Sequence, residues 1–301
     1  MVAEFDHGLF PFESCYFDRG DAIRLHYVDE GQGPPVVMVH GNPTWSFYYR
    51  NLISALRASH RCLALDHVGM GLSDKPKLGQ LYAYTLAERV ADFSAWLDSL
   101  RLAAPIVLVV HDWGGMIGLA WATQQPERIA KLVILNTSGF PLPDDTPFPW
   151  PLALTRTSLG ALLVQGFNAF SWVATIVAMT RTQMDENVRD AYTAPYDSWA
   201  NRIATLRFVQ DIPLLATDAS MAIVQTTAEN LHRLADKPTV IAWGGRDFVF
   251  NDAFLGQFCR LLPNAAVHYF ADAGHYVLED VAAEVVPLIV DFVREDDSAN
   301  G

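Results

Sequence analysis

The fold of this protein is decided by six residues, Val110-His111-Asp112-Trp113-Gly114-Gly115. An apolar run, Ile106 to Val110, leads into them, and Met116 to Thr123 opens a helical pattern. A sharp turn from a buried strand into a helix presents its central residue at the top of a sheet, and small residues flank that residue because backbones approach closely there. Serine is the usual central residue. Here it is Asp112, and Val110 replaces the first glycine of the pattern. The stretch predicts a nucleophile on a strand-to-helix turn.

Two further polar residues follow predicted strands later in the chain. Asp247 comes after the predicted strand Thr239 to Trp243, and His275 comes after Ala266 to Phe270. An aspartate such as Asp112 can also simply cap a helix. However, nucleophile, acid and histidine in this chain order are typical of the α/β-hydrolase fold, and open α/β sheets place active sites at the carboxyl ends of strands. We therefore predict a catalytic triad of these three residues.

The rest of the chain alternates apolar runs with helical patterns, which indicates a mostly parallel sheet covered by helices. The remaining predicted strands are a hairpin at Ser14 to Glu30 and apolar runs at Pro35 to His40, Arg61 to Asp66 and Lys131 to Leu135. The remaining predicted helices are Trp45 to Ser59, Leu86 to Leu100, Ala253 to Leu262 and Val281 to Arg294. We predict an α/β-hydrolase fold, a mostly parallel sheet flanked by helices.

The alternation stops after the predicted strand that ends at Leu135. Phe140 to Pro151 holds five prolines, and no strand candidate of similar quality appears before Thr239. The intervening sequence is helical and apolar, with scattered aromatic residues. We therefore predict that residues 139–213 form an inserted helical cap, and that residues 1–138 and 214–301 form the hydrolase core.

The most apolar window, Gly160 to Thr180, has the length of a membrane span. It contains Gln165, Asn168 and Ser171, and Gly166 is expected to break it. These polar residues favour a pair of cap helices. We expect at most a peripheral contact with a membrane.

Composition limits the partners and the compartment. The chain has 301 residues, 51% of them hydrophobic, which suffices for one core with a cap. A net charge of −13 repels phosphate backbones, so we expect no nucleic-acid partner. Cys15, Cys62 and Cys259 lack metal-ligand spacing, and we predict buried apolar thiols in a reducing compartment.

Residues 66–71 lack the spacing of a dinucleotide site. We expect no metal and no cofactor, and no signal peptide, hence a cytoplasmic protein.

A fourth motif, His40 to Trp45, follows the first buried strand. In this fold that loop supplies one N–H of the oxyanion hole, and the residue after the nucleophile supplies the other. These would be Asn42 and Trp113, whose side-chain N–H groups can also donate to a leaving anion. A carboxylate nucleophile suits displacement at saturated carbon and leaves an ester on Asp112. For hydrolysis, His275 would activate a water against that ester.

These motifs resemble those of the haloalkane dehalogenases, and the resemblance extends over essentially the whole chain. In particular they resemble the third subgroup, whose triad acid is an aspartate. The matching residues are His40 to Arg50 (HGNPTWSFYYR), Asp66 to Pro76 (DHVGMGLSDKP), Val110 to Gly115 (VHDWGG) and the Asp247/His275 pair.

Other stretches are more specific, and they are similar to the β-lactone decarboxylases of bacterial long-chain olefin biosynthesis. They are Arg156-Thr157, Gly166 to Phe170 (GFNAF), Ala194 to Arg202 (APYDSWANR), Phe208 to Pro213 (FVQDIP), Trp243 to Asp252 (WGGRDFVFND) and Gly274 to Asp280 (GHYVLED). The resemblance implies a small apolar substrate, a cis-3,4-dialkyl β-lactone, converted to a cis-alkene and carbon dioxide. It also suggests a multienzyme assembly with upstream enzymes of that pathway.

Three other functions stay open. A haloalkane dehalogenase would use the same Asp112 and hold the departing halide with Asn42 and Trp113. An epoxide hydrolase normally needs two cap tyrosines, and Tyr192 and Tyr196 are the only ones in the cap. A non-catalytic scaffold would normally have lost one member of the triad. We favour the decarboxylase.

Overall fold

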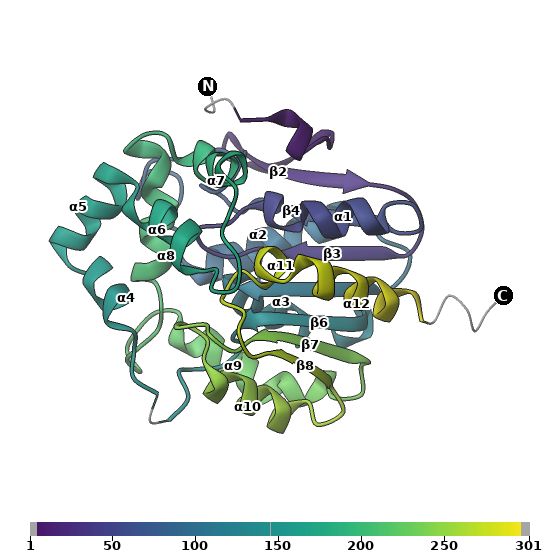
Figure 1. Cartoon of the computed structure of the whole chain (residues 1–301). Helices are drawn as coiled ribbons and strands as arrows, with labels where there is room; N and C mark the ends of the chain where they lie inside the picture. The colour runs from purple at the N-terminus through teal and green to yellow at the C-terminus, as the bar shows by residue number, and fades with distance from the viewer. Residues whose placement is uncertain (1–4, 145, 296–301) are drawn as a thin grey trace.

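The computed structural model of the protein describes residues 5–144 and 146–295. Within these residues lies one eight-stranded sheet in the order β1-β2-β4-β3-β5-β6-β7-β8 (Figure 1). β1 pairs antiparallel with β2, and β2 with β4, whereas all other neighbours are parallel. The predicted α/β-hydrolase architecture is confirmed. The strands are β1 (Ser14–Gly20), β2 (Ile23–Glu30), β3 (Pro35–Val39), β4 (Arg61–Leu65), β5 (Ile106–Asp112), β6 (Ile129–Thr137), β7 (Thr239–Gly244) and β8 (Ala266–Phe270).

The central strands are apolar throughout because helices bury both of their faces. In β5, Ile106, Leu108 and Val110 belong to one core, and Val107 and Val109 belong to the other. In Figure 1, α1, α11 and α12 lie in front of the sheet. α2, α3, α9 and α10 contribute to the core on its other face. The helices of the two layers are α1 (Arg50–Leu56), α2 (Leu86–Ser99), α3 (Trp113–Ala122), α9 (Met221–Asn230), α10 (Asp252–Leu261), α11 (Val277–Asp280) and α12 (Ala282–Arg294).

Five further helices, α4 to α8, come between β6 and β7 in the chain. Figure 1 shows α4, α5, α6 and α8 together beyond one end of the sheet, with α5 outermost in that view. The division of the chain into core and cap at 139 and 213 stays a prediction. The five helices are α4 (Trp150–Thr155), α5 (Ser158–Phe167), α6 (Ala169–Val177), α7 (Glu186–Thr193) and α8 (Ile203–Gln210).

The apolar window forms two helices, as predicted, but its break lies elsewhere. α5 continues through Gly166, and the break falls at Asn168, which has left-handed backbone angles (φ 53°, ψ 28°). Asparagine tolerates this conformation better than most residues, so it can end one helix and begin another. Among the described residues no single helix is long and apolar enough to cross a membrane, although the pair α5 and α6, bent by 83°, passes the same test together.

The prediction for the cysteines is only partly correct. Cys62 is buried, Cys15 is half-buried, and Cys259 is exposed. α10 turns Phe254 and Phe258 into the core. The next residue along a helix points about 100° away from its neighbour, so Cys259 faces the solvent.

Close backbone approach shapes the turn between β5 and α3. A Cβ on Gly114 would overlap the carbonyl oxygen of Val39 in β3. Val110, which replaces the first glycine of the motif, has space because a glycine, Gly118, faces it from α3. A Cβ on Gly118 would lie only 2.9 Å from the Val110 Cγ1 atom, so the glycine leaves room for the valine. The turn therefore tolerates the departure from the usual pattern.

Gly114→Ala should destabilise the protein by about 1–3 kcal/mol, because the new methyl group has no space beside β3. The midpoint of unfolding in urea measures this effect. Gly256→Ala in α10 is the matched control, since only the Arg260 Nη1 atom, 3.9 Å away, lies near the added Cβ. That variant should gain about 0.5–1 kcal/mol from helix propensity. Equal stability of Gly114→Ala and the native protein would contradict the account of the turn.

Candidate active site

Asp112 ends β5 and occupies the N-cap position of α3. Its backbone angles, φ 52° and ψ −127°, lie in a strained region for a residue with a side chain. Its carboxylate makes no capping hydrogen bond with α3. The carboxylate is thus free of the helix, and the interpretation of Asp112 as a simple helix cap is wrong. The strained turn has the form of a nucleophile elbow.

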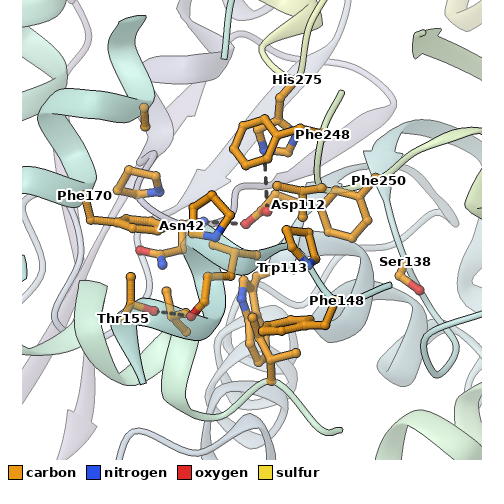
Figure 2. Close-up of a pocket in the computed structure, with 18 of the residues that line it drawn as sticks. Asn42, Asp112, Trp113, Ser138, Phe148, Thr155, Phe170, Phe248, Phe250 and His275 are labelled. Carbon is orange, nitrogen blue, oxygen red and sulfur yellow. Dashed lines mark hydrogen bonds and ion pairs between the residues drawn. The ribbon is translucent and has the colours of Figure 1, made fainter. Parts of the chain in front are cut away.

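The side chain of His275 lies between those of Asp112 and Asp247 and contacts both, although 163 positions separate Asp112 from His275 in the sequence. The Nε2 atom of His275 lies 3.5 Å from Oδ2 of Asp112, and its Nδ1 atom lies 2.6 Å from Oδ2 of Asp247. Figure 2 shows the Asp112 carboxylate between His275 and Asn42. The backbone N–H groups of Val249 and Phe250 donate to the other Asp247 oxygen and fix its orientation.

Asp112, His275 and Asp247 stabilise one another in their charged forms. Burial alone would raise the pKa of Asp112, but the hydrogen bond and charge of His275 hold that pKa below its ordinary value. Burial alone would lower the pKa of His275, but the charge of Asp247 and the hydrogen bond to Asp112 raise that pKa to about 10. At neutral pH the site therefore holds an ionised carboxylate beside an imidazolium.

Of the two predicted donors, Asn42 contacts the Asp112 carboxylate and Trp113 lines the cavity. The backbone N–H of Asn42 donates to Oδ1 of Asp112 at 2.6 Å, as expected of an oxyanion-hole donor. The Asn42 side-chain amide donates to the carbonyl of Thr205 in α8 at 3.1 Å, which leaves its second N–H for a ligand. The indole of Trp113 lines the cavity and packs against Phe208 with ring centroids 5.1 Å apart. No hydrogen bond joins the Trp113 backbone N–H to the Asp112 carboxylate within the described residues.

A cavity of about 270 Å³ extends from Asp112 beneath the cap. Its walls are mostly apolar and come from α4, α5 and α6 and from the β7–α10 loop, which contributes Phe248 and Phe250 (Figure 2). Asn42, Trp113 and His275 share its polar end with Asp112. Such a cavity suits an apolar ligand with one polar group that reaches the carboxylate.

The two cap tyrosines lie away from this cavity. The Tyr192 hydroxyl donates to the Glu279 carboxylate at 2.5 Å, and the Tyr196 hydroxyl donates to the carbonyl of Thr44 at 3.3 Å. Both side chains are buried, and neither lines the cavity. An epoxide hydrolase mechanism with these tyrosines as proton donors therefore has no support in the structure.

Two residues beyond the predicted triad and donors support the site. His111 donates from Nε2 to the backbone carbonyl of His275 at 2.9 Å, and burial lowers its pKa to about 3. Asp280 accepts the backbone N–H groups of Gly274 and Thr180 and so ties the histidine loop to the cap. The position of His111 beside the nucleophile was the only signal available, because the partners of both residues are distant in sequence.

Comparisons with known proteins agree with this fold. A family model for the α/β hydrolase fold matches residues 34–281. The cis-3-alkyl-4-alkyloxetan-2-one decarboxylase of Shewanella oneidensis is 53% identical over 291 residues, covering 96% of this chain and 91% of that protein. The enzyme of the same name from Xanthomonas campestris pv. campestris is 45% identical, covering 95% and 98%. The haloalkane dehalogenase DatA from Agrobacterium tumefaciens C58 superposes with a TM-score of 0.84 at 25% identity, covering 96% and 99%.

The chain therefore belongs to the α/β-hydrolase family, and the resemblance seen in its motifs is confirmed. The two decarboxylases match it over nearly their whole length, cap included. The dehalogenase shares its architecture at lower identity.

Asp247→Asn should lower the pKa of His275 below about 10, because the substitution removes the larger of the two charges that raise it. Nitrogen chemical shifts of the imidazole, followed by NMR against pH, measure this pKa. Since the pKa in the folded state exceeds the ordinary value of about 6.5, the stabilising contribution is complete below that pH and is lost as the pH rises through about 10.

Asp272→Asn provides the control for this measurement. It makes the same change of charge near His275 in the sequence, but its carboxylate is 55% exposed and pairs with Arg181. Screening by solvent should leave the His275 titration unchanged. An unchanged titration in Asp247→Asn as well would contradict the charge arrangement described above.

Proposed function

We propose that this protein is a β-lactone decarboxylase that converts cis-3,4-dialkyl β-lactones into cis-alkenes and carbon dioxide. One observation carries the chemistry: the buried, ionised carboxylate of Asp112 lies at the polar end of an apolar cavity, held by Asn42 and His275. The substrate class is supported by two relatives, 53% and 45% identical, which are named cis-3-alkyl-4-alkyloxetan-2-one decarboxylases.

In the first step, an oxygen of Asp112 attacks C4 of the lactone ring. The bond between C4 and the ring oxygen breaks, and its electron pair stays on the oxygen as a carboxylate. C4 is inverted, and Asp112 becomes an ester. The side-chain N–H groups of Asn42 and Trp113, which line the same cavity, would donate to the released carboxylate.

In the second step, the bond between C3 and the released carboxylate breaks, and carbon dioxide departs. Its electron pair forms the double bond, while the Asp112 ester leaves C4 from the opposite face as a carboxylate. Inversion followed by anti elimination gives net syn loss, so a cis-lactone yields a cis-alkene. No water is consumed. The imidazolium of His275 stabilises the Asp112 carboxylate as it is released, and Asp247 keeps that charge in place.

The apolar walls of the cavity suit the hydrophobic part of such a substrate. Each buried methylene group contributes about 0.8 kcal/mol, so two long alkyl chains supply most of the binding energy. The helices α4 to α6 provide apolar walls for these chains. We further propose that the protein acts in the cytoplasm on lactones made by the upstream enzymes of olefin biosynthesis, in an assembly with them.

A haloalkane dehalogenase is the second candidate. The same Asp112 would displace a halide held by Asn42 and Trp113, and a water activated by His275 would cleave the ester. The similarity to DatA favours this reaction, because the two structures superpose over 96% of the chain. The higher identity to the decarboxylases gives the first candidate priority.

The reaction products distinguish these candidates. The purified protein should convert a long-chain cis-β-lactone to the cis-alkene, detected by gas chromatography, and should release no halide from a 1-haloalkane. Asp112→Asn should abolish alkene formation, because an amide is not nucleophilic enough to open the ring. Rapid halide release with no alkene would support the dehalogenase instead.

Asp185→Asn is the matched control for that variant. Asp185 also occupies a helix N-cap position without capping it, at the start of α7, and it is exposed. This variant should retain full activity. Full activity in Asp112→Asn would contradict the role given to the nucleophile.

A further inference from the structure

One face of the cap is apolar and uncovered. It consists of side chains from α5 and α6, each at least 42% exposed. We call these residues the cap face: Leu159, Leu162, Phe167, Trp172, Val173, Ile176 and Val177. Exposed apolar patches of this kind mark surfaces that bind another apolar surface.

Several polar side chains of the two helices are buried, while large apolar ones are exposed. Gln165 of α5 and Ser171 and Thr175 of α6 are buried, whereas Trp172 and Ile176 on the other side of α6 are exposed. A helix on a water-exposed surface normally shows the opposite distribution. The cap face is therefore built for contact with an apolar phase.

The segment that carries the cap face has few charged residues, which favours a particular partner. The chain has 34 acidic residues and a net charge of −13, yet none of the acidic residues falls between residues 146 and 184. The only charged residue from 146 to 180 is Arg156, and its guanidinium donates inward to the carbonyls of Val209 and Ile212. A segment without carboxylates lets an acidic protein approach lipid phosphates with less repulsion.

The cap face adjoins the active-site cavity. Two of its residues, Val173 and Val177, are partly exposed and also line the cavity. Both belong to a single helix, α6. A substrate with two long alkyl chains, as the proposed function requires, dissolves in a bilayer rather than in water.

The geometry of the pair suits contact with a bilayer surface. The axes of α5 and α6 are bent by 83° relative to each other at Asn168. In Figure 1 α5 lies at the outer edge of the molecule, away from the sheet. Helices that lie in the interface bury their apolar side only about 5–10 Å deep, between the headgroups and the acyl chains.

We propose that the cap face docks on a phospholipid bilayer and that the lactone enters the cavity from that bilayer beside α6. The docking surface is inferred from the exposed apolar residues and the low charge of α5 and α6. The identity of the lactone as the ligand that enters there rests on the proposed function. A second copy of the chain and a partner enzyme are the competing occupants of this face.

The test uses flotation of the full-length protein with vesicles of phosphatidylethanolamine and phosphatidylglycerol in a ratio of about 3:1, which carry a negative surface charge. The variants are Phe167→Glu, Trp172→Glu and Ile176→Glu, none of which lines the cavity. The matched control is Val267→Glu near the start of β8, which is 42% exposed at the opposite end of the sheet. Circular dichroism checks that each variant is folded.

The native protein and Val267→Glu should float with the vesicles, and the three cap variants should stay in the unbound fraction. Absence of floating by the native protein would overturn the proposal. So would equal loss of binding in Val267→Glu. Concentration-dependent dimers in ultracentrifugation that the cap variants abolish, without vesicle binding, would show instead that the face joins two copies.

A second measurement separates this proposal from the proposed function. The cap variants should lose alkene formation from lactone carried in vesicles but keep the native rate with lactone in detergent micelles. Equal rates from vesicles in the native protein and the variants would contradict delivery through the face. Vesicle binding without any alkene from either preparation would leave the docking surface in place and refute the lactone as its cargo.

Discussion

The contact between the Asp112 carboxylate and the His275 imidazolium is the interaction on which the site depends. A buried carboxylate would ordinarily take up a proton, because charge is costly in an apolar environment. His275 prevents this, and Asp247 keeps His275 charged in turn. The backbone has to bring the carboxylate to this place. A Cβ on Gly41 would overlap the Asp112 carboxylate, so the oxyanion-hole loop and the nucleophile fit together only with a glycine there.

In the proposed mechanism, the same interaction lets a fold named for hydrolysis serve a reaction without water. A serine nucleophile must lose a proton to a histidine that is neutral, whereas Asp112 is already ionised and needs no base. His275 therefore becomes a fixed positive charge that stabilises Asp112 whenever it is released. The outcome then depends on the substrate. A lactone supplies its own electron pair for elimination when carbon dioxide departs, whereas the ester from a haloalkane must wait for water.

Much of the site could be predicted from the sequence because parallel strands end at a common edge. Asp112, Asp247 and His275 each follow an apolar run, so the fold itself brings them together. Contacts made across the cap could not be predicted in this way. The side chain of Asn42 donates a hydrogen bond to the backbone carbonyl of Thr205, 163 residues away, and no local sequence pattern predicts that contact.

The two wrong predictions, for Gly166 and for Cys259, concern features that depend on tertiary packing rather than on local sequence. Gly166 was expected to end a helix, but glycine only weakens a helix by about 1 kcal/mol, and packing can offset that cost. Asn168 ends it instead, in a left-handed conformation. Likewise, the burial of a cysteine depends on the side of its helix that meets the core, and Cys259 lies on the outer side.

The fate of oxygen in the Asp112 carboxylate tests the central claim, that Asp112 forms an ester which is released without hydrolysis. The enzyme would turn over the lactone many times in water labelled with heavy oxygen, and the peptide containing Asp112 would then be analysed by mass spectrometry. Because the ester leaves by cleavage at C4, the Asp112 oxygens should remain unlabelled while alkene accumulates. Incorporation of heavy oxygen into Asp112 would show that water attacks the ester carbonyl, and it would contradict the mechanism.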